Sequence, residues 1–238
     1  MDRRTFIKTC GSVATFSLLS SSFFSRSLKA QTNRFKKYKK AILLDKQGNP
    51  LNPSSLEVGK QYIFFYPYRS TPALLLNLGK EVKPSEVKLS DGSTYLWPGG
   101  VGPQRSIIAF CAICPHQLSY PTPEYSFINY YPHNKPSKAA KKGSVVQCCA
   151  HMSIFDPEKG GIVIDGPSEY PLLAIVLTYE EGKLYAIGTL GVELFRDFFD
   201  AYRSDLKKMY KSFRRAKKKV DKAVVVEVEE YVKEVIYC

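Results

Sequence analysis

The sequence contains little histidine and few acidic side chains. Only three of its 238 residues are histidine, and 22 aspartates and glutamates stand against 35 lysines and arginines, which gives a formal net charge of +13. This excess of positive charge indicates a partner surface that is acidic or anionic. Six cysteines do not make a disulfide framework. An apolar stretch near the start, residues 11–25, is short for a full membrane span.

The first thirty residues have the pattern of an export signal. Arg3 and Arg4 lie in a twin-arginine pattern over residues 2–8, and the Ser-rich apolar stretch follows it. Residues 28–30 are a mediocre cleavage site, so residues 1–30 are either removed or kept as an anchor. Residues 31–40 form a basic linker. The sequence therefore predicts a periplasmic protein, and an uncleaved N-terminal segment would attach it to the inner membrane.

Two short stretches combine cysteine with histidine. Cys114 and His116 have the spacing C-x-H, and Cys148 and His151 have the spacing C-x-x-H. Two thiolates and two imidazoles in two short loops suit a thiophilic metal. Zinc could take the four side chains tetrahedrally. A [2Fe–2S] cluster could take two cysteines on one iron and two histidines on the other.

The residues that follow His151 favour the cluster. Ser153 completes the order Cys-x-x-His-x-Ser, an aromatic-Asp-Pro turn follows at 155–157, and a Gly-Pro pair stands at 166–167. Over roughly residues 100–190 the chain thus resembles the Rieske iron–sulfur family, in which two such boxes precede a proline loop. The resemblance includes the Rieske subunits of quinol-oxidising complexes and the arsenite-oxidase small subunits.

The resemblance implies one [2Fe–2S] cluster and assigns a role to five residues. Cys114 and Cys148 would hold the buried iron. His116 and His151 would hold the outer iron at the tip of the domain. Ser153 would donate a hydrogen bond to a bridging sulfide, which raises the reduction potential by stabilising the extra charge of the reduced state.

The chain departs from the high-potential members of that family at two places. Phe155 stands where they carry a tyrosine bonded to a ligand sulfur, which implies a potential below the top of the Rieske range. The disulfide that ties their two loops would fall here on Ser119 and Ala150, which cannot form it. Cys111 and Cys149 lie near the boxes but out of register, and the sequence leaves open whether they form a substitute bridge or stay free.

From about residue 41 the pattern is that of short strands divided by turn signals. The apolar runs are 41–44, 61–66, 73–78, 105–113, 144–149, 171–179 and 184–188. Such runs favour an antiparallel sandwich or barrel, and the Rieske resemblance implies a mostly β fold, an antiparallel β sandwich with an inserted cluster-binding subdomain. We expect a Rieske domain over 41–190, with the subdomain at about 105–168.

The segment between the boxes, residues 117–147, is about twice as long as is usual in that family and is rich in tyrosine and proline. Long irregular loops are usually functional or disordered, and the aromatic side chains favour an ordered flap that shields the cluster or forms a docking edge. His133 lies in this segment. We expect it to be an ordinary surface residue rather than a third histidine ligand.

Residues 191–238 are predicted to be a C-terminal helical extension. Apolar residues recur at alternating spacings of four and three from Phe195 to Val220, which predicts a heptad stripe on a helix whose other faces are basic. We expect this stripe to dock a partner or a membrane rather than to build the cluster fold. Residues 223–238 read as a second helix, with a terminal strand as the alternative because of their β-branched residues.

The resemblance implies a one-electron transfer subunit of an exported or membrane-associated oxidoreductase complex. Its redox partner would be of the cytochrome b or c type or of the molybdopterin type, and no nucleic acid is expected. A structural zinc-binding module that uses the same cysteines and histidines is the alternative. A ring-hydroxylating oxygenase would need two further histidines for a mononuclear iron, and only His133 remains for it.

Overall fold

Strands are the main regular structure in the part of the chain that the computed structural model describes, residues 34–238. The twin-arginine signal and the first residues of the basic linker lie outside the described residues. Within the described part, no helix has both the length and the apolar character needed to cross a membrane. The predicted mostly β fold class is confirmed.

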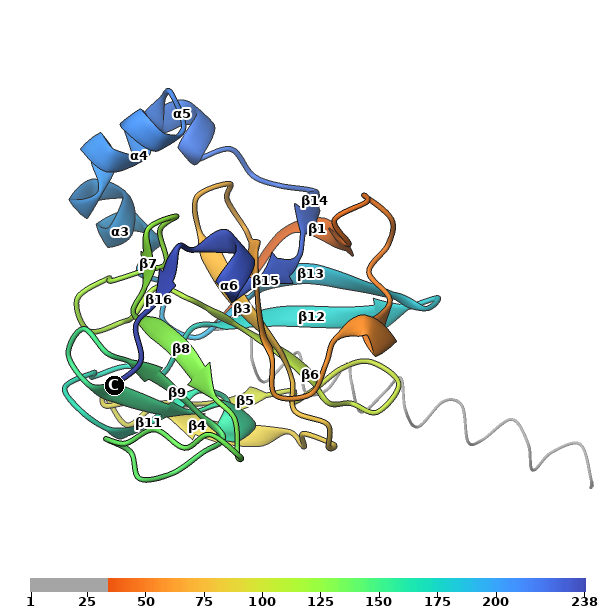
Figure 1. Cartoon of the computed structure of the whole chain (residues 1–238), viewed down its shortest axis with the longest axis vertical. Helices are drawn as coiled ribbons and strands as arrows, with labels where there is room; N and C mark the ends of the chain where they lie inside the picture. Colours follow the sequence, from red (N-terminus) through yellow and green to blue (C-terminus); the bar gives the residue numbers. More distant parts are fainter. Residues whose placement is uncertain (1–33) are drawn as a thin grey trace, which may run out of the picture. The chain divides into compact units, whose positions relative to one another are not determined.

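The largest sheet has eight strands in the order β14-β1-β13-β12-β6-β3-β2-β15 (Figure 1). All neighbours are antiparallel except β1 and β14. Its strands are β1 (Phe35–Leu44), β2 (Gln61–Phe65), β3 (Pro72–Asn77), β6 (Ile107–Cys111), β12 (Ala174–Glu180), β13 (Lys183–Leu190), β14 (Lys222–Val224) and β15 (Val226–Glu227). The two edge strands, β14 and β15, follow one another directly in the chain, so this sheet is nearly closed on itself.

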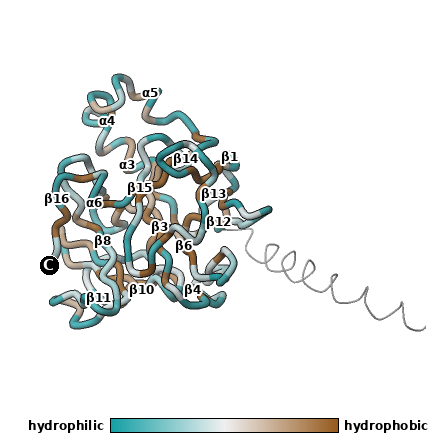
Figure 2. The backbone as a smooth tube through the Cα atoms, turned by 45° about the vertical axis from the view of Figure 1, so that its right-hand side comes forward, coloured by the Kyte–Doolittle hydropathy of each residue, from teal (hydrophilic) through white to brown (hydrophobic). Residues whose placement is uncertain are grey.

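Both faces of this sheet are buried, which explains the continuous apolar runs of its central strands. Side chains alternate along a strand. On β3, Leu75 therefore enters one hydrophobic core, whereas Leu74 and Leu76 enter the other. Figure 2 shows brown, apolar backbone along β3 and β6 at the centre of the molecule. The first core packs against the C-terminal helices, and the second includes the two predicted ligand cysteines.

A smaller antiparallel sheet builds the region predicted as the cluster subdomain. Its order is β11-β10-β9-β8. The strands are β8 (Ile128–Tyr131), β9 (Val145–Cys148), β10 (Ser153–Asp156) and β11 (Ile162–Asp165), and the short helix η2 (Pro157–Lys159) follows β10. The hairpin of β4 (Ser85–Lys88) and β5 (Thr94–Trp97) and the short helix η1 (Pro53–Ser55) complete the region before β6.

The segment between the boxes is ordered, as its aromatic residues predicted, but it is not a flap. It supplies the edge strand β8 and the two-residue strand β7 (Tyr125–Ser126). Tyr130 and Tyr131 of β8 are buried. His133 is exposed in the turn that follows β8, as expected of a surface residue.

The heptad stripe does not form one helix, so that prediction is wrong. Three short helices replace it: α3 (Phe195–Ala201), α4 (Arg203–Met209) and α5 (Phe213–Ala216). The breaks have local causes. Tyr202 and Tyr210 leave the helical region, Lys211 has a positive φ of 62°, and Ser212 begins α5 by accepting a hydrogen bond from the Arg215 N–H.

The prediction that this stripe docks a partner is also wrong, because the domain itself covers it. Of the stripe residues, Leu206 has no exposed surface and Phe199 is 3% exposed, and both belong to the first hydrophobic core. Phe199 lies edge-to-face on Tyr68 with ring centroids 5.2 Å apart, and Phe198 does the same on Tyr120 at 4.9 Å. Aromatic side chains of the base domain therefore supply the cover that the stripe needs.

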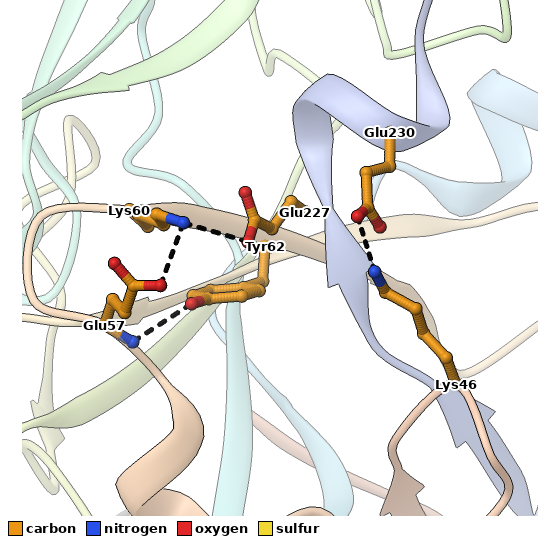
Figure 3. Close-up of polar contacts among 6 residues, drawn as sticks. All are labelled: Lys46, Glu57, Lys60, Tyr62, Glu227 and Glu230. Carbon is orange, nitrogen blue, oxygen red and sulfur yellow. Dashed lines mark hydrogen bonds and ion pairs between the residues drawn. The ribbon is translucent and has the colours of Figure 1, made fainter.

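The last residues are mainly extended rather than helical, which favours the strand alternative. Besides β14 and β15 they form one helical turn, α6 (Val228–Tyr231), and the short strand β16 (Glu234–Val235). Exposed ion pairs fasten this segment to the base domain: Lys60 contacts Glu227 at 3.1 Å and Lys46 contacts Glu230 at 2.5 Å (Figure 3). Such pairs contribute little each, so the strand pairing carries the attachment.

Candidate metal centre

The two predicted Cys/His stretches fold into loops with the same backbone turn. In the first, the Leu118 N–H donates to the Cys114 carbonyl at 2.9 Å; in the second, the Met152 N–H donates to the Cys148 carbonyl at 2.8 Å. Leu118 and Met152 have φ values of 60° and 65°. A non-glycine residue in this region is uncommon and often marks a functional turn. We call residues 114–119 the first ligand loop and residues 148–152 the second ligand loop.

The two cysteine sulfurs lie at the inner end of the site. Cys114 and Cys148 are buried, at 1% and 0% exposure, in the same apolar core. The Ser119 hydroxyl of the first ligand loop lies 3.5 Å from the Cys148 sulfur. Backbone N–H groups of His116 and Gln117 donate to the Cys114 sulfur, and those of the second loop donate to the Cys148 sulfur. Donors around both sulfurs suit thiolate ligands, since they stabilise negative charge there.

The two thiols differ in how readily each loses its proton. A hydrogen bond from the Cys114 thiol, helped by the Ser119 hydroxyl, lowers the pKa of Cys148 to about 6 despite its burial. The same contact and burial raise the pKa of Cys114 well above its usual range. One thiolate therefore forms readily in this pair, whereas removal of the second proton requires a positive charge such as a metal.

The two imidazoles lie at the outer end of the site. The rings of His116 and His151 are edge-to-face with centroids 4.9 Å apart. His116 is half-buried and His151 is exposed. The predicted ligands thus form two pairs: the buried sulfurs of Cys114 and Cys148, and the adjacent imidazoles of His116 and His151.

Two buried polar atoms at this site have no hydrogen-bond partner: the Ser153 hydroxyl and the His116 Nδ1. Buried polar atoms are nearly always bonded, and leaving one unsatisfied costs about 1–3 kcal/mol. A bound group that accepts from the serine and takes the imidazole nitrogen as a ligand would satisfy both. In the described part of the chain, no three His, Cys, Asp or Glu side chains are grouped to hold one ion.

The predicted proline loop approaches the second ligand loop closely. Gly166 has a φ of 88°, and a Cβ on it would lie 2.4 Å from the Met152 carbonyl oxygen. No other residue could occupy this position without moving the ligand loop. The Gly-Pro pair therefore closes one side of the site.

The structure answers the question that the sequence left open for Cys111 and Cys149: these two cysteines do not form a bridge with each other. Cys149 forms a disulfide with Cys238, and Cys111 is free and buried. Burial raises the pKa of the Cys111 thiol to about 12, so it stays protonated. The partners of the disulfide are 89 residues apart, and neither their spacing nor a motif indicates the pairing.

Sequence comparison finds similar proteins among the subunits of a reductase. The chain is 28% identical over 192 residues to the iodate reductase subunit IdrB of Denitromonas iodatirespirans. The aligned residues are 81% of this chain and 83% of that protein. It is 27% identical over 139 residues to IdrB of Pseudomonas sp. (strain SCT), 58% of either chain. The likeness to Rieske-type proteins predicted from the two boxes is thereby confirmed.

No family model matches the chain. Among solved structures it is similar to the soluble domain of the Rieske protein II (soxF) from Sulfolobus acidocaldarius, with a TM-score of 0.46 and 26% identity. That similarity covers 64% of this chain and 78% of the other.

Proposed function

We propose that the site holds one [2Fe–2S] cluster and that the protein is a one-electron transfer subunit of an oxidoreductase complex. Cys114 and Cys148 would bind the inner iron, and His116 and His151 the outer iron. The observation that carries this proposal is the presence of two buried sulfurs beside one another and of two adjacent imidazoles, one half-buried and one exposed. Such a cluster supplies one-electron chemistry at a potential set by its hydrogen bonds and exposure.

The residues of this chain have separate tasks around that cluster. Burial of the cysteine sulfurs excludes water from the inner side. The backbone N–H groups of both ligand loops, together with Ser119, stabilise negative charge on the sulfurs. Ser153 is placed to donate its hydroxyl hydrogen into the site. The exposed His151 brings the outer end to the surface, where an electron can pass to or from a partner.

The partner is inferred from the relatives and from charge. Both relatives are named as subunits of iodate reductase, which supports a role beside another subunit of an oxidoreductase. A molybdopterin-type subunit and a cytochrome b or c are the two candidates. The net charge of +13 favours an acidic docking surface on that partner. The protein would act in the periplasm, with residues 1–30 either cleaved or retained as a membrane anchor.

Metal and sulfide analysis tests the cofactor. The chain would be produced in a host that assembles iron–sulfur centres and purified without oxidation. We expect two iron and two acid-labile sulfide per chain, with a visible absorption that bleaches on reduction. One zinc per chain without iron or sulfide would establish the zinc-binding alternative instead.

Co-purification tests the partner. A tagged chain recovered from its native periplasm or membranes should bring with it a subunit that contains molybdopterin or haem. That subunit should exchange electrons with the reduced chain in a stopped-flow mixing experiment. A tagged chain that carries its cluster but is recovered alone, at low and moderate salt, would contradict the subunit role.

A further inference from the structure

The C-terminal residues lie beside the segment that joins the two ligand loops. Strand β16 pairs in parallel with β7, with Glu234 opposite Tyr125 and Val235 opposite Ser126. The Ile236 N–H donates to the Ser126 carbonyl at 2.9 Å. The fully buried Asn129 donates its side-chain amide to the Ile236 carbonyl at 2.9 Å. The chain end is thus held by backbone pairing and by a buried side chain.

The final residue is held more tightly still. The Cys238 N–H donates to the Tyr131 hydroxyl at 2.8 Å, and the buried Gln147 donates to the Cys238 sulfur at 3.1 Å. Tyr237 and Tyr131 lie edge-to-face with ring centroids 5.4 Å apart. Cys238 is bonded to Cys149, and their Cα atoms are 5.8 Å apart.

Cys149 belongs to the second ligand loop, between the candidate ligands Cys148 and His151. Its N–H donates to the Phe127 carbonyl at 2.6 Å, and the Tyr131 hydroxyl lies 3.3 Å from its sulfur. Backbone and side chain of this one residue are therefore fixed from different directions. The first ligand loop has no disulfide, because its cysteine, Cys114, is free. The Cys114 thiol and the Ser119 hydroxyl contact the Cys148 sulfur without a covalent bond.

We propose that residues 233–238 are a covalent clasp that positions the second ligand loop, with Cys149 and Cys238 as positioning residues. The clasp takes the place of a disulfide between the two ligand loops, which Ser119 and Ala150 do not allow. It ties the second loop to the chain end instead of to the first loop. The predicted effect of the clasp on retention of the cluster rests on the proposed function, whereas its predicted effect on the mobility of the second ligand loop does not.

The test compares the wild type with the Cys149→Ser/Cys238→Ser double variant, and Cys111→Ala serves as the control for loss of a cysteine outside the clasp. Peptide mapping without reductant should first recover residues 149 and 238 joined in the wild type. Hydrogen exchange then reports the amides of both ligand loops. In the double variant we expect faster exchange at 149–152 and unchanged exchange at 114–119 and in β3 and β6.

The second readout is loss of the cluster to a chelator, followed by visible absorption. We expect the double variant to assemble the cluster and to lose it about 10-fold faster, as is typical when support behind a metal ligand is removed. Cys111→Ala should match the wild type. A wild type without any cluster would sink the proposed function but leave the exchange measurement to decide the clasp.

Three results would overturn the clasp: free thiols at both positions in the wild type, unchanged exchange at 149–152, or equal acceleration of exchange throughout the core. If the double variant does not fold, Tyr131→Phe provides a milder variant, since it removes only the hydroxyl that bonds the Cys238 N–H. It should accelerate exchange at 149–152 in the same direction but to a smaller extent. No change at these amides in Tyr131→Phe would likewise overturn the proposal.

Discussion

The structure of the two ligand loops is determined by residues close together in the sequence, whereas that of the C-terminal segment 191–238 is determined by contacts with distant residues. Each ligand loop is a local structure, in which one hydrogen bond between residues four apart sets the turn and a short spacing sets the donors. The C-terminal segment is defined by partners far away in the chain: β14 pairs with β1, β15 with β2 and β16 with β7. The difference implies that changes in the loops should alter the cofactor and spare the fold, whereas changes in the buried helices α3 to α5 should do the reverse.

Removal of a ligand cysteine should have the largest effect. Cys148→Ala would remove one of the two sulfurs that we propose bind the inner iron, so we expect complete loss of visible absorption and of iron. Cys111→Ala is the matched control, because that cysteine is equally buried but free. Both variants should keep the circular dichroism of the wild type. A Cys148→Ala chain with full iron content would show that the ligand is assigned incorrectly.

Replacement of an outer ligand should change the potential rather than abolish the cluster. His151→Cys adds negative charge to the outer iron, so the reduction potential should fall toward the value of about −400 mV of plant-type ferredoxins. His116→Cys should lower the reduction potential in the same way. His133→Ala, at the one histidine outside the site, should leave the potential unchanged in protein-film voltammetry. An unchanged potential in His151→Cys would exclude this side chain as a ligand.

Substitutions in the buried C-terminal helices should change the stability of the fold and leave the cluster unchanged. Leu206 on α4 has no exposed surface, so Leu206→Ala should lower the free energy of unfolding by about 2–5 kcal/mol. Met209 on the same helix is 40% exposed, and Met209→Ala should change it by about 0.5 kcal/mol or less. Denaturant melts measure both, and neither variant should alter the EPR spectrum. A Leu206→Ala chain as stable as Met209→Ala would mean that the helices are not part of the core.

Single hydrogen bonds at the site should have the smallest effect. Ser153→Ala removes a donor worth about 1 kcal/mol, which corresponds to about 40 mV for one electron, so the potential should fall by this order. Phe155 is fully buried in the core that holds both cysteines. Phe155→Tyr should raise the potential by a similar amount if its hydroxyl reaches a ligand sulfur. The absence of any rise would place that hydroxyl away from the sulfurs.

The pairing of the candidate ligands in two short loops could be predicted from the sequence, because the determinants of each loop are short-range. The spacing from Cys148 to His151 and on to Ser153 restricts these side chains to one loop, and the Gly-Pro pair at 166–167 marks the loop that closes on it. Burial of the sulfurs and exposure of His151 then follow from their places on the two loops. The mostly β class was equally accessible, since strand alternation and turn residues are local signals.

The C-terminal segment could not be predicted in the same way. The repeat from Phe195 to Val220 has the right period for a helix, but the aromatic residues that cover it, Tyr68 and Tyr120, are remote in sequence. The breaks at Tyr202 and Tyr210 are marked by neither glycine nor proline, and the cap residue Ser212 is their main local signal. The same holds for the bond between Cys149 and Cys238, because the approach of two distant cysteines depends on the closed fold.

The central claim is that two imidazoles and two thiolates hold one [2Fe–2S] cluster, and pulsed EPR of the reduced protein tests it most directly. The account predicts a rhombic signal with an average g below the free-electron value and hyperfine couplings from two histidine nitrogens. One of these couplings should disappear in His116→Cys and the other in His151→Cys. A reduced cluster without histidine nitrogen couplings, or a protein with zinc and no EPR signal, would contradict it.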